Sequence, residues 1–488
     1  MYKVKNFLTQ KVISIALFSA VFMIILALFY LSYSNNNELY PFFEDETIHF
    51  NSCRSFIETG SLKAYSFFEL NYSKIGEFNW YGPGYTLFYG GIGKIFGFHH
   101  GKVIIISHFI LLFFSLFVVY KNENQQGIWM GIFLLLSGSI PYLYTYAPAI
   151  LNFCGGIFIS LVLFKYLETD QNKDKNKLLI QLLGLVFLFA FFRTTTIFFL
   201  FGMLAEFVSL KKYLKSILLV VISLILVMVF MKYFTAPMFI SAGTEIIKLE
   251  NGDIFSFVTT FIHRFKNNSI AFYLNLNLNH ISILISIAAT TSLFLLIKKR
   301  VLGAVVLINF VFLAIMLGMY VATPFYMDKQ ICILLPLNVI AFVKFADKKA
   351  MVTLLSVFLF LFPKHLQVAK NYIDEGQQAY HFCNSSSFSR EVRTINNFFK
   401  SKKSTLVLIN LEELRKMPYP FYIFASSFPL SKGPNQTIRY SVMLNFDYFL
   451  SIKNYTDFDY FLSTSIHVNE KLHLCGKTEN FYIYSLLN

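Results

Sequence analysis

Long apolar runs recur along this chain from its N-terminus to about residue 363. Several are shorter than the roughly 20 residues that cross a bilayer without tilt. The runs lie near 13–33, 103–120, 128–144, 148–164, 178–192, 195–210, 216–234, 281–297, 302–321, 330–345 and 351–363. So regular a series predicts a polytopic α-helical membrane protein with about 11 transmembrane helices.

Lysine and arginine gather in every second connection between these runs. Short cytoplasmic loops of membrane proteins carry an excess of cations, so these connections and the N-terminus are expected inside. This parity places 34–102, 235–280 and everything after about 364 on the outer face. The residues concerned are Lys3, Lys5, Lys11, Lys121, Lys173, Lys175, Lys177, Lys211, Lys212, Lys215, Lys298, Lys299, Arg300, Lys344, Lys348 and Lys349.

The composition limits the function classes further. Hydrophobic residues make up 56% of the 488 residues and charged residues only 14%, which no soluble globular chain of this length shows. The cytoplasmic cations explain the net charge of +15, so membrane lipids are expected partners and nucleic acid is not. The first run is too long for the apolar core of a signal peptide and is expected to be a retained anchor. The bias toward Phe, Ile, Lys and Asn is typical of an AT-rich bacterial genome and favours the bacterial inner membrane.

The chain becomes more polar after about residue 364, and its apolar runs shorten to strand size. This change predicts a transmembrane domain over 1–363 followed by a small extracytoplasmic α/β domain over 364–488. The strand-sized runs are 404–409, 421–424 and 481–484.

Two outer loops belong to the transmembrane domain, a first loop over 34–102 and a second large loop over 235–280. In the second, an apolar stripe from Ile254 to Phe265 has helical spacing. It predicts an interfacial helix, and a lid that gates lipid access is the alternative.

The first outer loop carries an acidic cluster just beyond the first apolar run. Glu44, Asp45 and Glu46 are followed one turn later by His49. Asp45 is expected to cap a helix that lies against the membrane and ends at Gly60. By spacing alone, a plain N-cap with an acidic first turn is favoured over a catalytic carboxylate as the explanation of the cluster.

A second helix is predicted in the same loop, from Tyr85 to Phe96. Pro83 and Gly84 open it and Gly97 closes it. Its aromatic residues lie on one side, which fits a helix in the membrane interface.

Two cations stand at predicted outer boundaries. A hairpin that turns near 192–196 keeps the lysine-rich segments before and after it in the cytoplasm, and it brings Arg193 to the outer face. Arg193 either snorkels to lipid headgroups or binds an anionic substrate. Lys329 lies in the next short outer connection and is either neutralised by Asp328 or joins the same binding.

Four short motifs follow one another in the order found in a known group of proteins. They cover 45–60, 81–97, 191–196 and 328–336. They resemble the Asp-Glu motif, the Pro-containing juxtamembrane segment, the basic residue before a Thr-rich helix start and the late Pro-containing helix of protein O-mannosyltransferases. The group (glycosyltransferase family 39/83-like) belongs to the GT-C superfamily and includes lipid A aminoarabinose transferases. Many of its members carry a second Asp where this chain has Asn152.

The resemblance implies a GT-C fold and a site at the outer membrane face. It implies an inverting glycosyltransferase that moves a sugar from a polyprenyl-phosphate donor to a hydroxyl of a lipid, glycan or protein acceptor. Such a reaction needs a base for the acceptor proton and cations for the departing phosphate. Asp45 is the candidate base, with Glu46 beside it, and the candidate phosphate partners are Arg193, Lys329, Lys94 and Arg264. Glu44, His49, Tyr81, Tyr85 and Asn152 are candidate acceptor-binding or secondary residues.

A divalent cation stays open as a cofactor. The cluster from Glu44 to His49 offers oxygen and nitrogen ligands, but no two-His or Cys-x-x-Cys spacing predicts a dedicated zinc site.

Two alternative functions fit the membrane pattern. A transporter or flippase of lipid-linked glycans would place ionisable residues near the bilayer midplane, whereas the notable ones here lie at the outer boundary. A polymerase or ligase of O-antigen type also works at that face. The early acidic loop and the terminal domain favour the transferase.

Overall fold

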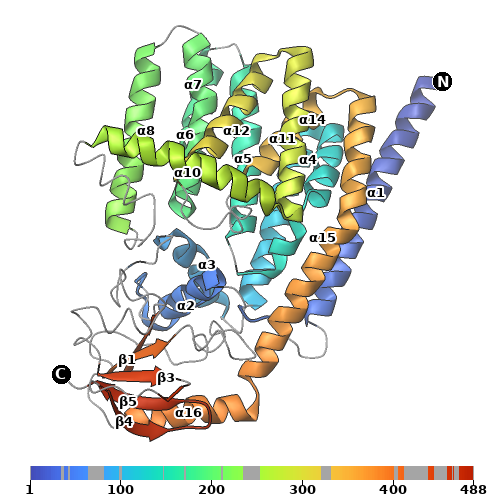
Figure 1. The fold of residues 1–488 in the computed structure, drawn as a ribbon. Helices are drawn as coiled ribbons and strands as arrows, with labels where there is room; N and C mark the ends of the chain where they lie inside the picture. The colour runs from blue at the N-terminus through green and yellow to red at the C-terminus, as the bar shows by residue number, and fades with distance from the viewer. Residues whose placement is uncertain are drawn as a thin grey trace. The chain divides into compact units, whose positions relative to one another are not determined.

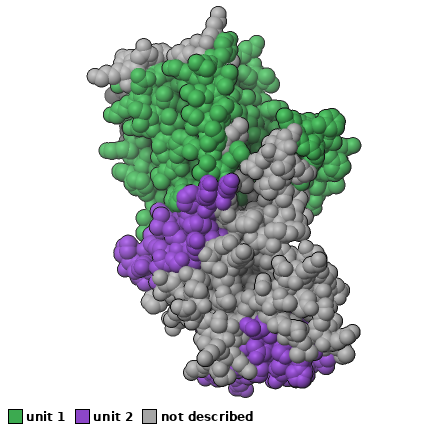
Figure 2. All heavy atoms as spheres, turned by 90° about the vertical axis from the view of Figure 1, so that its left-hand side faces the viewer, with its two compact units in different colours: residues 1–31, 106–230, 240–372 green, residues 32–105, 231–239, 373–488 purple. Residues whose placement is uncertain are grey.

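The structure is a computed structural model of the full chain. It describes residues 2–33, 38–41, 44–63, 78, 82–97, 102–146, 148–169, 172–209, 213–234, 253–319, 331–400, 405–410, 438–443, 459–463, 465–466 and 472–486. The chain forms two compact units, coloured separately in Figure 2. Unit 1 comprises residues 1–31, 106–230 and 240–372, and unit 2 comprises residues 32–105, 231–239 and 373–488.

Unit 1 is a helical bundle (Figure 1). α5 packs against α6 and α14, and α12 packs against α7 and α11. Its helices are α1 (Tyr2–Tyr33), α4 (Lys102–Leu136), η2 (Ile140–Tyr144), α5 (Ala149–Glu168), α6 (Asn172–Phe192), η3 (Thr194–Phe199), α7 (Leu200–Ser209), α8 (Tyr213–Phe234), α10 (Ile254–Leu274), α11 (Leu278–Ile297), α12 (Arg300–Met319), α14 (Leu334–Phe345) and the first part of α15 (Lys348–Cys383).

The described helices confirm the predicted polytopic membrane protein. Eight of them are long and apolar enough to cross a membrane, and three shorter apolar helices cover 126–136, 194–204 and 334–345. Each of the eleven predicted runs corresponds to one of these helices. α4 contains two runs, because the chain turns back at Asn124, whose φ is 50°.

One predicted helix is shorter than expected. The run 128–144 is helical only to Leu136, and the chain then continues as a buried non-helical segment into η2. The hydroxyls of Ser137 and Ser139 donate to the Leu134 carbonyl at 2.8 and 3.3 Å, and Gly138 has a φ of 95°. These features end the helix inside a segment that is apolar on average.

Protein groups surround this buried segment. His365 of α15 bonds to Ser282 at 2.9 Å, and its ring lies so close to Gly138 that an added Cβ there would be 2.6 Å from Cε1. Asn279 donates to the Tyr142 hydroxyl at 2.9 Å. The arrangement satisfies the rule that non-helical backbone at membrane depth must be enclosed by protein.

The predicted hairpin near 192–196 is confirmed. Lys175, near the start of α6, forms an ion pair of 2.6 Å with Glu206, near the end of α7. Arg300 at the start of α12 is also paired with Glu206, at 3.3 Å. The two helices therefore run antiparallel, and three helix ends meet at one end of unit 1.

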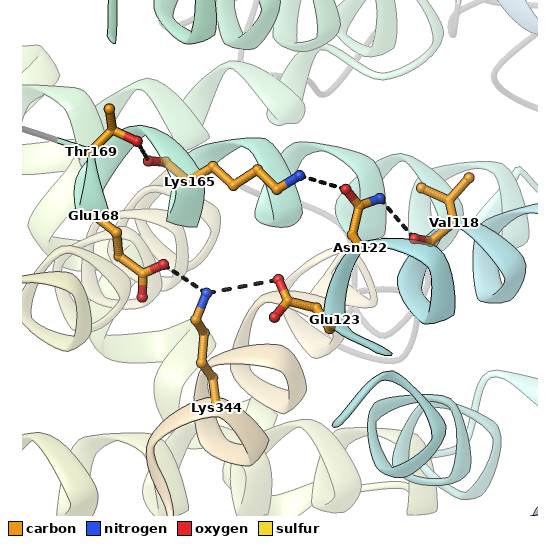
Figure 3. Close-up of polar contacts among 7 residues, drawn as sticks. All are labelled: Val118, Asn122, Glu123, Lys165, Glu168, Thr169 and Lys344. Atoms are coloured by element: carbon orange, nitrogen blue, oxygen red, sulfur yellow. Dashed lines mark hydrogen bonds and ion pairs between the residues drawn. The ribbon is translucent and has the colours of Figure 1, made fainter. Parts of the chain in front are cut away.

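A second ion-pair cluster joins further helix ends of unit 1 (Figure 3). Lys344 at the end of α14 lies 2.7 Å from Glu168 of α5 and 3.7 Å from Glu123 of α4. Lys165 donates to Asn122 beside them. All these ends were predicted on the cytoplasmic side by the charge parity, and the structure brings them together.

α10 covers the predicted apolar stripe and lies across the bundle rather than along it (Figure 1). Asp253 caps it and accepts a hydrogen bond from the Ser256 amide at 3.0 Å. Its contact with α12 centres on Gly318, where an added Cβ would lie 2.1 Å from the Phe261 ring. Asn268 donates to the Leu317 carbonyl at 2.8 Å. α10 is thus tied to the last turn of α12.

Unit 2 contains two short helices, the end of α15, α16 and a five-stranded sheet (Figure 1). The sheet has the order β2-β1-β3-β5-β4; β1 pairs in parallel with β2 and β3, and β5 pairs antiparallel with β3 and β4. The elements are α2 (Glu44–Thr59), α3 (Pro83–Phe96), α16 (Ser386–Lys400), β1 (Thr405–Asn410), β2 (Ile438–Met443), β3 (Tyr460–Ser463), β4 (Leu472–Lys477) and β5 (Tyr482–Leu486).

The predicted C-terminal α/β fold is confirmed, with two changes. The runs 404–409 and 481–484 match β1 and β5, whereas 421–424 lies outside the described residues. α15 was expected to end near residue 363, but it continues through Pro363 to Cys383. The predicted domain boundary at 363/364 therefore falls inside one helix. The two cysteines of this domain, Cys383 and Cys475, are free thiols.

A buried carboxylate holds the turn between β4 and β5. Glu391 of α16 is 4% exposed and accepts hydrogen bonds from the Thr478 hydroxyl and from the amides of Glu479 and Asn480, the latter two at 3.2 and 3.1 Å. The pairing joins α16 to the sheet.

Replacing Glu391 by Ala is expected to loosen this part of the domain by about 2 kcal/mol, because charged hydrogen bonds contribute roughly 1.5–3 kcal/mol. Hydrogen exchange of the amides between 472 and 486, measured on the whole protein, should accelerate. Arg390→Ala, at the exposed neighbouring position, is the control. Unchanged hydrogen-exchange protection of these amides in Glu391→Ala would contradict the proposed role of Glu391 in joining α16 to the sheet.

Candidate functional site

The acidic cluster lies in the first turn of α2, which packs against α3. α2 begins at Glu44, so Asp45 lies inside the helix and not at the predicted cap position. The predicted end is correct, since the helix stops at Thr59 and Gly60 follows with a φ of 75°. α3 likewise ends at Phe96, before Gly97 with a φ of 82°.

The two helices run parallel. Near their starts, the rings of His49 and Tyr85 are 4.3 Å apart. Further along, an added Cβ at Gly90 would lie 2.8 Å from the ring of Phe56. The glycine thus lets the helices approach closely, and the start of α3 lies beside the acidic end of α2.

Glu46 belongs to the face of α2 that is buried in unit 2. Glu46, His49 and Cys53 are each 0% exposed, and Phe50 is 3% exposed. The spacing of three and four residues places them on one side of the helix. Burying a carboxylate and an imidazole costs folding free energy unless the groups form specific contacts, so such burial indicates either a specific contact or a function.

The same face contains the thiol of Cys53, and Tyr40, which precedes α2 in the chain, packs against Phe50 of this face. Burial raises the pKa of Cys53, so this thiol stays protonated and is not a nucleophile. Burial also raises the pKa of Tyr40, whose ring contacts Phe50 and Tyr380 at centroid distances of 5.8 and 5.7 Å. The Tyr40 amide donates to the Gly376 carbonyl at 3.0 Å. α2 is thereby anchored to the last part of α15.

Lys94 lies at the other end of the helix pair. Its Nζ is 5.6 Å from the centre of the Phe56 ring, and an added Cβ at Gly60 would lie 3.7 Å from that nitrogen. Because α2 rises 1.5 Å per residue, Gly60 is about 20 Å from Asp45 along the axis. The structure does not bring Lys94 next to the acidic start of α2.

Arg193 stands at the turn between α6 and η3 in unit 1. Its amide donates to the Phe189 carbonyl at 2.8 Å, and its own carbonyl accepts from Thr196 at 3.0 Å. The extended backbone, with φ −149° and ψ 112°, separates the two helices. The half-buried Arg193 side chain is thus fixed at a helix junction, at the end of α6 opposite to the Lys175–Glu206 pair.

Asn152 lies in the first turn of α5 and is 2% exposed. Neither atom of its carboxamide has a hydrogen-bond partner. α5 packs against α6 and η3, and one turn further on an added Cβ at Gly155 would lie 2.4 Å from the Phe189 ring.

Arg264 lies on α10 between Phe261 and Asn268, the two residues that contact the end of α12. These positions are three and four residues apart and share one side of the helix. Arg264 is half-buried there.

The remaining predicted site residues lie outside what the structure describes. Tyr81 and Lys329 are not among the described residues, and of Glu44 and Asp45 only the helical backbone is described. Across the described part of the chain, no three His, Cys, Asp or Glu side chains are grouped so as to hold a metal ion.

Sequence reasoning missed three hydroxyls. Thr86 beside Tyr85, and Thr195 and Thr196 after Arg193, each bury a hydroxyl without a hydrogen-bond partner. The only available signal was their position directly after residues already singled out, since a threonine in an apolar run is otherwise expected to bond to its own helix.

Comparison with known proteins yields a likeness to a solved structure. No family model matches the chain, and no curated sequence matches it. Among solved structures, ArnT from Cupriavidus metallidurans in the apo state superposes with a TM-score of 0.50 at 9% identity, covering 96% of this chain and 97% of that chain. ArnT is a lipid A aminoarabinose transferase of the GT-C class.

This is the GT-C fold. The likeness extends over nearly the whole chain, from the membrane helices to the C-terminal sheet, and it agrees with the fold that the four sequence motifs implied. At 9% identity it establishes the arrangement of the chain, and the chemistry must be argued from the residues. In the GT-C fold of this chain, the described candidate residues fall into two groups, Glu46, His49, Tyr85 and Lys94 in unit 2 and Asn152, Arg193 and Arg264 in unit 1.

Proposed function

We propose that this protein is an inverting glycosyltransferase. It moves a sugar from a polyprenyl-phosphate donor to a hydroxyl of an envelope lipid, glycan or protein, at the outer face of the bacterial inner membrane. The observation that carries the proposal is the buried Glu46 and His49 face of α2, held by α3 directly beside Asp45, in a chain with the GT-C fold. A membrane protein that does not transfer protons would not require an acidic helix start held in a fixed position.

In the proposed reaction, the Asp45 carboxylate removes the proton of the acceptor hydroxyl. The acceptor oxygen attacks the anomeric carbon from the side opposite the phosphate, the bond from that carbon to the phosphate oxygen breaks, and polyprenyl phosphate leaves. A single displacement of this kind inverts the anomeric configuration, whereas retention would need a second carboxylate as nucleophile.

The other residues support these steps. Glu46 and His49 fix α2 against α3, so that Asp45 does not have to be ordered when the substrates bind. Arg193 stabilises the charge on the departing phosphate, since a guanidinium can hold phosphate oxygens through two parallel hydrogen bonds. Lys329 and Arg264 add positive charge. Lys94 of α3, which lies near the end of α2 opposite to Asp45, is assigned to lipid headgroups.

The orientation in the membrane is supported by the ion pairs of unit 1. Lys344, Lys175 and Arg300 meet carboxylates at one end of the bundle, and the positive-inside rule assigns that end to the cytoplasm. Arg193 lies at the other end of α6, which is the end expected at the outer face.

Sugar transfer by the purified protein tests the proposal. The protein is incubated with a panel of polyprenyl-phosphate sugars and with extracted envelope lipids, glycans and membrane proteins. We expect one donor to give a product of inverted anomeric configuration together with free polyprenyl phosphate. If no donor is used in a panel that works with a related transferase, the transferase function is wrong, and movement of intact lipid-linked glycans into proteoliposomes would support the transporter instead.

Arg193 is expected to act on the phosphate. Arg193→Lys keeps the charge but loses the paired hydrogen bonds, and should lower kcat/KM by about tenfold or more, which corresponds to roughly 1.5–3 kcal/mol for a charged hydrogen bond. Arg193→Met, which also removes the charge, should lower kcat/KM further. Initial rates at varied donor concentration measure both. Equal kcat/KM in wild type and Arg193→Met would remove Arg193 from this role.

A further inference from the structure

Three polar side chains without partners lie on α5 and η3, two elements that pack against each other. Asn152 is 2% exposed and Thr196 is 0% exposed. Both atoms of the Asn152 carboxamide and the hydroxyl oxygens of Thr195 and Thr196 are buried and form no hydrogen bond. Buried polar atoms are nearly always hydrogen-bonded in proteins, so four such atoms on two packed elements point to a ligand.

The elements that carry these side chains are firmly placed. The Phe189 ring lies against Gly155, one turn along α5 from Asn152. Four residues after Phe189, Arg193 turns the chain into η3, and Thr196 donates its amide to the Arg193 carbonyl at 3.0 Å. The unpartnered groups therefore belong to the same junction as Arg193.

The chemistry of the groups restricts the ligand. A carboxamide both donates and accepts hydrogen bonds, and so does a threonine hydroxyl. A phosphate only accepts, so it would leave the Asn152 carbonyl oxygen buried and unsatisfied. An ammonium group only donates, and it would be buried beside a guanidinium without a carboxylate among the described residues of the junction. A neutral hydroxyl group, which both donates and accepts, satisfies all of them.

We propose that Asn152, Thr195 and Thr196 form a subsite for the hydroxyls of the donor sugar, and that the sugar transferred carries no ammonium group. This inference rests on the proposed function, in which Arg193 binds the phosphate. The group attached to that phosphate is the sugar, so a sugar subsite is expected next to Arg193. Asn152 is then a specificity-determining residue, and an Asp at the same place would favour an amino sugar.

Matched donors test the subsite. The purified full-length protein is given a pentose and a hexose on the same polyprenyl phosphate, each as the parent sugar and with one ring hydroxyl replaced by an amine. Wild type is expected to prefer the parent sugars by about tenfold or more in kcat/KM, since a site built around hydroxyls rejects groups that leave its buried atoms unpaired. Asn152→Asp should reduce or reverse that preference, and Thr196→Val should lower kcat/KM for the parent sugars.

Ser160→Ala is the matched control, because Ser160 also lies on α5 and also has a buried hydroxyl without a partner, but two turns from Asn152. It should leave the ratio between parent and amino donors unchanged. Thermal stabilisation by each donor is measured on the same samples, because a ligand stabilises a protein whether or not it reacts.

The outcomes separate the two proposals. A wild type that uses or binds amino donors as well as the parent sugars, or an unaltered ratio in a stable Asn152→Asp variant, overturns the subsite and leaves the transferase intact. A wild type that transfers none of the sugars overturns the proposed function. In that case, stabilisation by parent sugars that is lost in Asn152→Asp still supports the subsite, and equal stabilisation of both proteins overturns it.

Discussion

Asp45→Asn is expected to reduce sugar transfer by about a hundredfold to ten-thousandfold, the range typical of a lost general base. The substitution keeps the size of the side chain and removes its ability to take the acceptor proton. Donor binding should change little, because the proposed phosphate-binding cations lie on other elements than Asp45. The measurement is the single-turnover rate of transfer from a labelled donor, together with donor binding and thermal stability of the same preparation.

A matched carboxylate serves as the control for this prediction. Asp374→Asn makes the same change at an exposed position of α15 and should keep the rate within about twofold. Transfer that survives in Asp45→Asn at the wild-type rate would remove Asp45 as the base and direct attention to Glu46, whose burial is described above.

Glu206→Ala is expected to destabilise the membrane bundle by about 3–5 kcal/mol. The Glu206 side chain is 0% exposed and lies 2.6 Å from Lys175 and 3.3 Å from Arg300. Removing the carboxylate leaves two cations at a helix junction without their counter-ion, and uncompensated charges of this kind are costly. Thermal unfolding in detergent should show a large fall in the melting temperature.

An exposed ion pair provides the comparison. Glu168 is 35% exposed and pairs with Lys344 at 2.7 Å, so Glu168→Ala should cost no more than about 1 kcal/mol. Equal losses of unfolding free energy in Glu206→Ala and Glu168→Ala would mean that burial does not determine the strength of these ion pairs. A double variant, Glu206→Ala with Arg300→Met, should recover part of the stability by removing one unpaired charge.

Most of the membrane topology could be predicted from the sequence because lipid imposes a simple rule. A spanning segment must be apolar and must satisfy its own backbone, so apolar runs and cation parity together locate helices and their ends. The Lys175–Glu206 contact agrees with the hairpin that parity alone required.

The errors have definite causes. The run 128–144 is apolar on average, so hydropathy alone did not reveal that the helix ends before Gly138 inside the protein. The rise in polarity after about residue 364 suggested a helix end, but the next buried positions are His365, Ala369 and Ile373, whose spacing of four continues the helix through Pro363. One missing hydrogen bond costs less than the burial of that stripe contributes.

The candidate site could be predicted only in part. The residue types of a membrane transferase were visible at Asp45, His49 and Arg193, because acid, imidazole and cation stand out in an apolar chain. That Glu46 is buried with His49, and that Lys94 lies at the far end of α2, depends on the parallel packing of α2 on α3, which no local pattern encodes. The unpartnered state of Asn152 is likewise a property of packing.

Gly138 limits how this chain can diverge. Its φ of 95° and the His365 ring, 2.6 Å from where a Cβ would be, exclude alanine as firmly as larger side chains. Every missense change at this codon therefore harms the fold, whereas at Gly184 an added Cβ meets nothing within 4 Å. Homologues that share the buried turn should keep glycine here even where almost all other residues of the membrane helices have been replaced. This position can therefore reveal common ancestry between two sequences whose overall identity is too low to show it.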